Sequence, residues 1–185
     1  MYSIELMVEE HDNILKFNEV VKQACLRGIR GEDLDVEDMT KMIAFGRNYA
    51  DKHHHGKEEQ LLFNEMVAHL GRIGQNLITH GMLVEHDLGR FHVGEWEGAL
   101  NEYKADRNEE SKLNIIVNAM AYTQLLIRHI NKENEVVYTY AEKHLDPNLL
   151  KEIDEKVIAF ENEAKELKIQ SYYLNMLAEL MAKYQ

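Results

Sequence analysis

The sequence contains very little cysteine and proline. Its 185 residues include one cysteine, Cys25, and one proline, Pro147. A single cysteine excludes a disulfide framework, and it also excludes a cysteine-rich zinc or iron–sulfur site. One proline and ten glycines supply few turns for a fold of many short strands. Long helices are therefore favoured.

Basic residues and long apolar runs are also scarce. Lys and Arg number 21 against 33 Asp and Glu, which gives a net charge of -12. This balance argues against binding to nucleic acid or to an anionic membrane surface. No apolar run approaches the roughly 18 residues that cross a bilayer. The first residues turn acidic at Glu5, unlike a secretory signal. We therefore expect a cytoplasmic protein with neither a nucleic-acid nor a membrane partner.

Apolar residues recur at helical spacing through most of the chain. A glycine-rich turn at 28–31 and a break over 71–76 interrupt the pattern, and Asp35 is expected to cap the second helix. The pattern predicts helices over about 3–27, 36–70, 79–105 and 109–144. Long helices joined by short turns predict an all-α fold, an antiparallel up-down-up-down four-helix bundle.

The remaining residues predict a C-terminal helical extension. We expect the bundle to occupy residues 1–145 and the extension residues 146–185. Asp146 is a plausible cap, with Pro147 at the first helical position. A break is expected near Gln170 and Ser171. The extension could pack on the bundle or on a second chain, so a homodimer through it is one expectation.

Ten histidines are roughly twice the usual number for this length. On helices that advance about 100° per residue, several of them fall on the apolar stripe. The inward-facing set comprises His11, His55, Glu59, His86, His129 and Glu133. On the same phase His54 and Glu58 turn to the polar side, although Glu58 could be recruited if the helix is distorted. The other histidines are expected at the surface: His53, His54, His69, His80, His92 and His144.

Carboxylates on a buried stripe need a partner. Each costs several kcal/mol to bury unless it is paired or bound to a metal. The inner faces offer little counter-charge apart from Lys52 and Arg90. One inward histidine is ordinarily a satisfied core residue, but six converging side chains favour a metal site. Without thiolates the set suits iron, manganese or zinc. Zinc prefers closed tetrahedral sites, so iron is our choice. If Glu59 and Glu133 both bridge, each of two ions receives two histidines and two carboxylate oxygens.

The order and spacing of these residues resemble the hemerythrin-like HHE cation-binding domain over about residues 3–144. The local strings are Glu10-His11-Asp12, His54-His55-Gly56-Lys57-Glu58-Glu59, Glu85-His86-Asp87-Leu88-Gly89-Arg90 and His129-Ile130-Asn131-Lys132-Glu133. The resemblance implies a non-heme centre of two iron ions, linked by an oxo or hydroxo group, with two glutamates as bridges.

The sequence departs from the oxygen-carrying hemerythrins at two positions. Those proteins have a second histidine where this chain has Arg90, and a carboxylate where it has Asn134. The chain is therefore similar to the four-His branch, which includes repair-of-iron-centres proteins and iron-sensing domains. This implies a protein that binds or reacts with O2, NO or peroxide, for sensing, binding or detoxification. The alternative is iron sensing or delivery for the repair of iron centres, and a purely structural bundle is a third interpretation.

Two further residues are candidates for supporting roles. Arg90, one turn after His86, could hydrogen-bond a bound anion or a bridging carboxylate, or could simply extend to solvent. Tyr122, two turns before His129, could donate a hydrogen bond to a metal ligand or to a bound oxygen species, or could pack in the core. No residue is assigned as catalytic, and whether the chain turns over NO or peroxide as an enzyme stays open.

Overall fold

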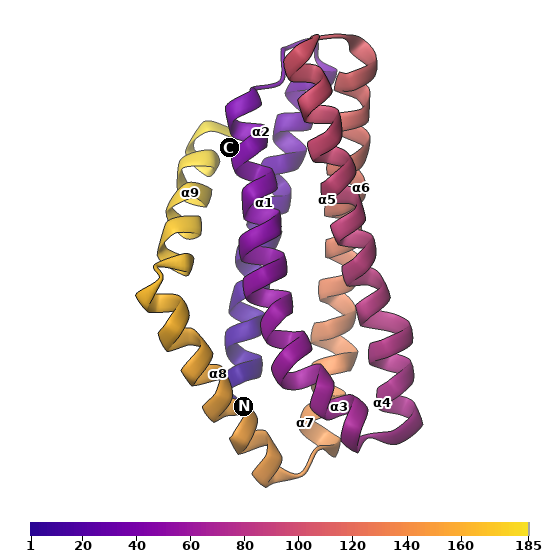
Figure 1. Cartoon of the computed structure of the whole chain (residues 1–185), viewed down its shortest axis with the longest axis vertical. Coiled ribbons are helices and arrows are strands. Elements are labelled where there is room, and N and C mark those ends of the chain that lie inside the picture. Colours follow the sequence, from indigo (N-terminus) through magenta and orange to yellow (C-terminus); the bar gives the residue numbers. More distant parts are fainter. Residues whose placement is uncertain (185) are drawn as a thin grey trace.

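The computed structural model describes residues 1–184, and these residues form helices without any strand. They build an antiparallel bundle of four rods (Figure 1). The first rod is α1 (Tyr2–Ile29). The second comprises α2 (Val36–Phe45), η1 (Gly46–His55), η2 (Glu58–Phe63) and α3 (Asn64–His69). The third comprises α4 (Gly71–Leu77), η3 (Ile78–Met82) and α5 (Leu83–Ala105). The fourth comprises α6 (Glu109–Lys132), η4 (Glu133–Val137) and α7 (Tyr138–His144). The predicted all-α bundle is confirmed.

Short polar signals begin and end the rods. The Asp35 side chain accepts the main-chain N–H groups of Glu37 and Asp38, so it caps α2 as predicted. The break predicted over 71–76 is wrong in extent, because α4 already begins at Gly71. The chain reverses sharply there with Gly71 at a φ of 57°, a left-handed conformation that glycine adopts without strain.

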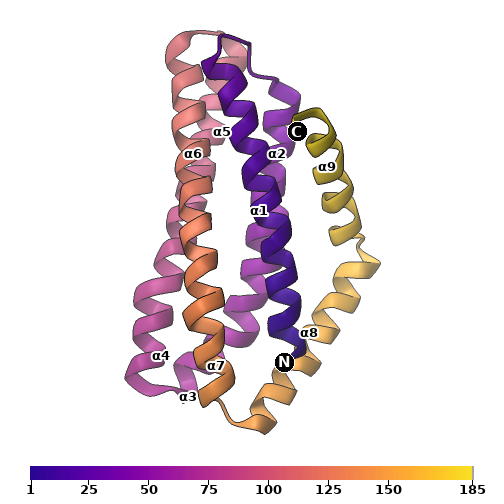
Figure 2. The same cartoon turned by 180° about the vertical axis from the view of Figure 1, so that it is seen from behind.

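The C-terminal extension packs against its own bundle. Its two helices, α8 (Pro147–Glu166) and α9 (Ile169–Tyr184), lie along α1 and α2, on the side away from α5 and α6 (Figures 1 and 2). Asp146 caps α8, and Pro147 stands in its first turn. The break falls at 167–168, slightly before its predicted position. Dimerisation through the extension stays a prediction. None of the helices in residues 1–184 has the length and apolar character needed to cross a membrane.

The apolar core is divided into two clusters along the bundle axis. One contains Ile14, Phe17, Phe45, Val93 and Leu126 among others, and the second contains Met7, Leu62, Met82 and Val137 among others. On each rod the predicted site histidine lies between a residue of one cluster and a residue of the other. His11, for example, falls between Met7 and Ile14 on α1. The histidines therefore form a polar layer enclosed by apolar layers above and below.

Wide π-helical turns lie beside this polar layer on three rods. They are η1 and η2 on the second rod, η3 on the third and η4 on the fourth. A π turn closes i→i+5 hydrogen bonds and holds more residues than an α turn. Each residue then advances by less than the roughly 100° of an α-helix, and the difference accumulates along the ten residues of η1. Positions after η1 consequently face a different direction from the one an α-helix predicts.

Candidate metal centre

Seven buried side chains from all four rods meet in the polar layer. They form two groups, His55–Glu58–His86–His129 and His11–His54–Glu58–Glu133, which share Glu58. Within each group, the atoms able to bind a metal lie within 4.8 Å of one another. None of these residues is more than 3% exposed. We call the seven residues the His/Glu cluster.

Both carboxylates of the cluster lie between the two groups. Glu133 places Oε2 3.3 Å from Nε2 of His11 and Oε1 3.0 Å from Nε2 of His129. The Oε2 atom of Glu58 lies 3.7 Å from Nε2 of His54 and 3.6 Å from Nε2 of His86. Each carboxylate therefore touches imidazoles of both groups, which is the position a bridging ligand between two cations requires.

Four of the five imidazoles are held from outside by an oxygen acceptor. Each donates its Nδ1–H group to that acceptor, so the lone pair of Nε2 faces inward. The pairs are His11 with Asn134 Oδ1 at 2.7 Å, His54 with Glu10 Oε2 at 2.8 Å, His86 with Glu59 Oε1 at 2.7 Å and His129 with Glu85 Oε2 at 3.0 Å. This arrangement fixes the tautomer and the ring orientation that a metal ligand needs.

The inward-facing atoms need a cation. The Nε2 atoms of His86 and His129 lie 3.1 Å apart, although each ring already donates its proton at Nδ1. His55 Nδ1 lies 3.4 Å from Asp51 Oδ1, outside the cluster. Within the described residues, several atoms inside the cluster make no hydrogen bond: His54 Nε2, Glu58 Oε2 and both oxygens of Glu133. Buried polar atoms are almost always satisfied. A pair of metal ions would satisfy these atoms together, so the donor set fits such a pair.

When no metal is bound, protons supply the positive charge of the cluster. Burial disfavours the charged form of His129, but the charge of Glu133, 3.0 Å away, and the hydrogen bond that His129 donates to Glu85 raise the pKa of His129 to about 10. Burial and the charge of Glu133 hold the pKa of Glu58 well above its usual range. Burial also opposes the ionisation of Glu133. The charge of His129 outweighs that effect and keeps the pKa of Glu133 well below its usual range. The two carboxylates therefore differ, and a proton is held more readily by Glu58 than by Glu133.

The structure corrects one glutamate of the predicted set. Glu58 is fully buried in the cluster, whereas the side chain of Glu59 is 28% exposed and lies outside both groups. The prediction that Glu59 faces the core and Glu58 the polar side is wrong, because the π turns of η1 rotate the residues that follow. Glu59 instead accepts a hydrogen bond from Nδ1 of His86 and thereby orients that ring.

The structure also brings together five imidazoles instead of four. His54 belongs to the cluster, and His53 is buried beside it, so the expectation that both lie at the surface is wrong. The four-imidazole ligand set implied by the resemblance lacked this fifth ring. His11, His55, His86, His129 and Glu133 all lie in the cluster, as predicted. Their role as metal ligands stays a prediction.

The two predicted supporting residues have different positions. Arg90 donates from NH2 to Glu59 Oε1 at 2.6 Å and from Nε to Asp51 Oδ1 at 2.9 Å, so it holds the acceptor of His86. Tyr122 makes no hydrogen bond to the cluster within the described residues. The tyrosine that does is Tyr138, whose hydroxyl donates to Glu58 Oε1 at 2.5 Å. Sequence analysis missed Tyr138 because it lies five residues after Glu133, which places it on the same face only in a π turn.

A buried ion network lies behind His54. Glu10 accepts from Nζ of Lys57 at 2.6 Å and from Nε2 of His53 at 3.1 Å, besides its bond with His54. Lys57 also pairs with Glu161 on α8. Glu10, His53 and Glu161 lie close enough to bind a metal, but the Lys57 ammonium already supplies their cation. The network therefore connects the C-terminal extension, through Lys57 and Glu10, to the imidazole of His54 in the cluster.

Comparison with known proteins gave one family. The chain matches the model of the hemerythrin HHE cation binding domain over residues 2–141. Neither the curated proteins nor the solved structures compared with the chain gave a match. The matched residues include all four rods of the bundle up to Ala141, and with them every member of the His/Glu cluster.

Proposed function

This chain belongs to the hemerythrin HHE cation-binding family, and from that premise we propose that it holds two iron ions in the His/Glu cluster and uses them to bind or react with O2, NO or peroxide. The observation that carries the proposal is the convergence of five buried imidazoles and two buried carboxylates, several of whose atoms have no hydrogen-bond partner within the described residues. Nitrogen and oxygen donors without thiolate suit iron in a helical bundle.

The donors are distributed unevenly between the two groups. His55, His86 and His129 serve one ion, whereas His11 and His54 serve the other. If both carboxylates bridge, the protein supplies five donors to the first ion and four to the second. An ion with six positions therefore has more room for a small external ligand on the side of His11 and His54.

The metal pair, when bound, supplies a Lewis-acidic and redox-active centre. The residues of the chain control its surroundings. The outer acceptors hold four rings at fixed angles, and the Tyr138 hydroxyl holds Glu58.

Metal analysis and visible spectra of the anaerobically reduced protein test the proposal. We expect two irons per chain and new absorption bands on addition of O2 or NO. The neighbouring glutamates provide a matched pair of variants. Glu58→Gln should lose stoichiometric iron. Glu59→Gln should keep it, with an affinity reduced roughly 10–100-fold, as is typical when the partner of a ligand is changed.

Each arm has a clear contrary outcome. Full iron occupancy in Glu58→Gln would refute the bridge assignment. A wild-type protein with two irons that shows no spectral change with O2, NO or peroxide would refute the reaction while leaving the metal site intact. Stoichiometric binding of zinc or manganese in preference to iron would refute the choice of metal.

A further inference from the structure

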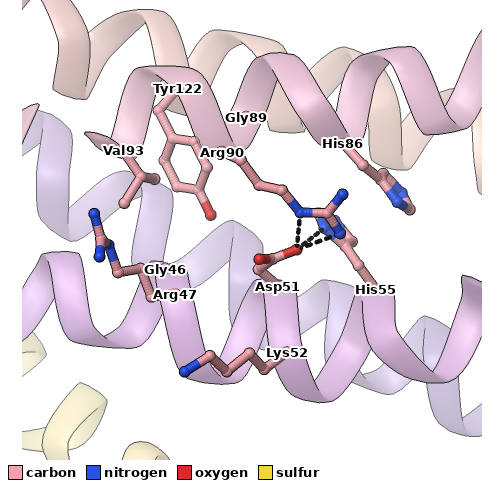
Figure 3. Close-up of a pocket in the computed structure, with 10 residues that line it drawn as sticks. All are labelled: Gly46, Arg47, Asp51, Lys52, His55, His86, Gly89, Arg90, Val93 and Tyr122. Atoms are coloured by element: carbon pink, nitrogen blue, oxygen red, sulfur yellow. Dashed lines mark hydrogen bonds and ion pairs between the residues drawn. The ribbon is translucent and has the colours of Figure 1, made fainter. Parts of the chain in front are cut away.

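A separate cavity of about 270 Å³ opens between the second and third rods (Figure 3). Its lining includes Gly46, Lys52, Gly89, Val93 and Tyr122, and its other end reaches the rings of His55 and His86. Figure 3 shows the Arg90–Asp51 ion pair between Tyr122 and the two histidines. The cavity therefore lies beside the His/Glu cluster, on the side of its three-imidazole group.

The cavity is larger than a diatomic ligand needs. Pockets that hold small organic molecules measure about 300–1,000 Å³, so this cavity falls just below that range. Two glycines keep it open next to Tyr122. A Cβ atom on Gly46 would lie 3.3 Å from the Tyr122 hydroxyl, and one on Gly89 would lie 3.6 Å from the Tyr122 ring. The size fits a small organic molecule.

The Tyr122 hydroxyl is a donor without an acceptor. The residue is only 2% exposed, and within the described residues its hydroxyl makes no hydrogen bond. Its ring lies against both glycines, and in Figure 3 the hydroxyl points into the cavity. Burial raises the pKa of Tyr122, so the group keeps its proton and can donate it. Because the hydroxyl faces the cavity, a molecule bound there can accept its hydrogen bond.

The charges around the cavity favour an anion. Arg47, Lys52 and Arg90 line it, against a single acidic residue, Asp51. Arg90 pairs with Asp51 and Glu59, and Arg47 pairs with Glu97 at 2.7 Å. Within the described residues Lys52 makes no ion pair and donates to the neutral side chain of Asn48. Lys52 is therefore the lining cation left to attract a negative charge in a chain whose net charge is -12.

We propose that this cavity binds a small organic monocarboxylate. The carboxylate accepts a hydrogen bond from the Tyr122 hydroxyl and faces Lys52, and the apolar body packs on Val93 and the two glycines. The proposal rests on these lining residues and does not require that iron, or any metal, occupies the cluster.

Titration of the full-length, metal-loaded protein with benzoate tests the proposal by calorimetry and by the methyl resonances of Val93. We expect saturable binding of one benzoate per chain. Benzamide, the neutral analogue, should bind more weakly. Tyr122→Phe should weaken benzoate binding roughly tenfold or more, because it removes one hydrogen bond to a charged group. Gly89→Leu should abolish binding by filling the cavity. Gly94→Leu on the same helix is the control, because a side chain at Gly94 meets nothing and should leave binding unchanged.

Several results would overturn the proposal. Absence of saturable binding would mean that the cavity holds only water. If benzamide bound as tightly as benzoate, the carboxylate would not be recognised. If inorganic phosphate bound as tightly, the apolar body would not be recognised. Unchanged binding in both Tyr122→Phe and Gly89→Leu would place the ligand elsewhere. Since the titration can be repeated on metal-free protein, failure here is distinguishable from failure of the iron proposal.

Discussion

Replacing Lys57 with methionine tests how strongly the buried network supports the metal centre. The ammonium group is fully buried and pairs with Glu10 and Glu161, which lie on different helices. Methionine has a similar volume but no charge. The variant therefore leaves two carboxylates close together without their cation.

The magnitude follows from the burial of the pair. Removing one partner of a buried ion pair costs about 3–5 kcal/mol, because the remaining charge stays desolvated. For a chain of this size that cost corresponds to a melting temperature lower by about 6–20 °C. The effect should also reach the metal, since Glu10 holds His54, and changing such outer partners typically lowers metal affinity 10–100-fold.

A matched lysine provides the control. Lys132 pairs with Glu85, which holds His129 in the same way that Glu10 holds His54. The side chain of Lys132 is 51% exposed, so water already screens the pair. Lys132→Met should therefore cost less than about 1 kcal/mol.

Urea unfolding of wild type and both variants, with and without metal, measures these differences. Glu161→Gln combined with Lys57→Met should recover part of the stability, because it removes one of the stranded charges. Equal losses in Lys57→Met and Lys132→Met would refute the reasoning, since burial would then have no influence on the cost.

Three further predictions follow from the site and the fold. Tyr138→Phe removes the hydroxyl that donates to Glu58 and should cost about 1–3 kcal/mol in urea unfolding of metal-free protein; no change would contradict the hydrogen bond. Because the pKa of metal-free His129 is raised to about 10, a metal ion must displace the proton of His129. Metal affinity should therefore rise about tenfold per pH unit through the neutral range. Titrations with divalent iron or manganese at several pH values measure this slope, and its absence would contradict the prediction. Gly74→Ala places a Cβ atom 2.3 Å from a main-chain carbonyl oxygen and should lower thermal stability by about 1–3 kcal/mol. Gly98→Ala meets no neighbouring atom and should raise stability by up to about 1 kcal/mol. Equal effects of the two substitutions would refute the close approach at Gly74.

Most of the cluster could be predicted from residue spacing. His11, His86 and His129 lie on or beside regular α-helix, where a constant advance per residue holds, and their inward direction followed from their apolar neighbours. Glu59 was chosen over Glu58 because the same advance was applied across η1, where π turns replace α turns. The error also hid His54, and with it the fifth imidazole of the cluster.

The outer partners could not be predicted from spacing. Glu10 and Lys57 read as surface charges on their own helices, and only the packing of α8 against the bundle buries them together with Glu161. Asn134 and Arg90 were noted as departures from the oxygen carriers. In the structure one of them holds His11, and the other holds the acceptor of His86.

The amino-acid pattern alone determined that four amphipathic helices bundle around an inward set of histidines, because apolar periodicity and polar turns act within a few residues of one another. Three outcomes were decided only when the rods packed together: that Glu58 enters the cluster, that Lys57 neutralises Glu10 and Glu161, and where a cavity stays open. Those outcomes depend on the local winding of the helices and on contacts between residues far apart in the chain, and both arise from the close packing of side chains in the folded protein.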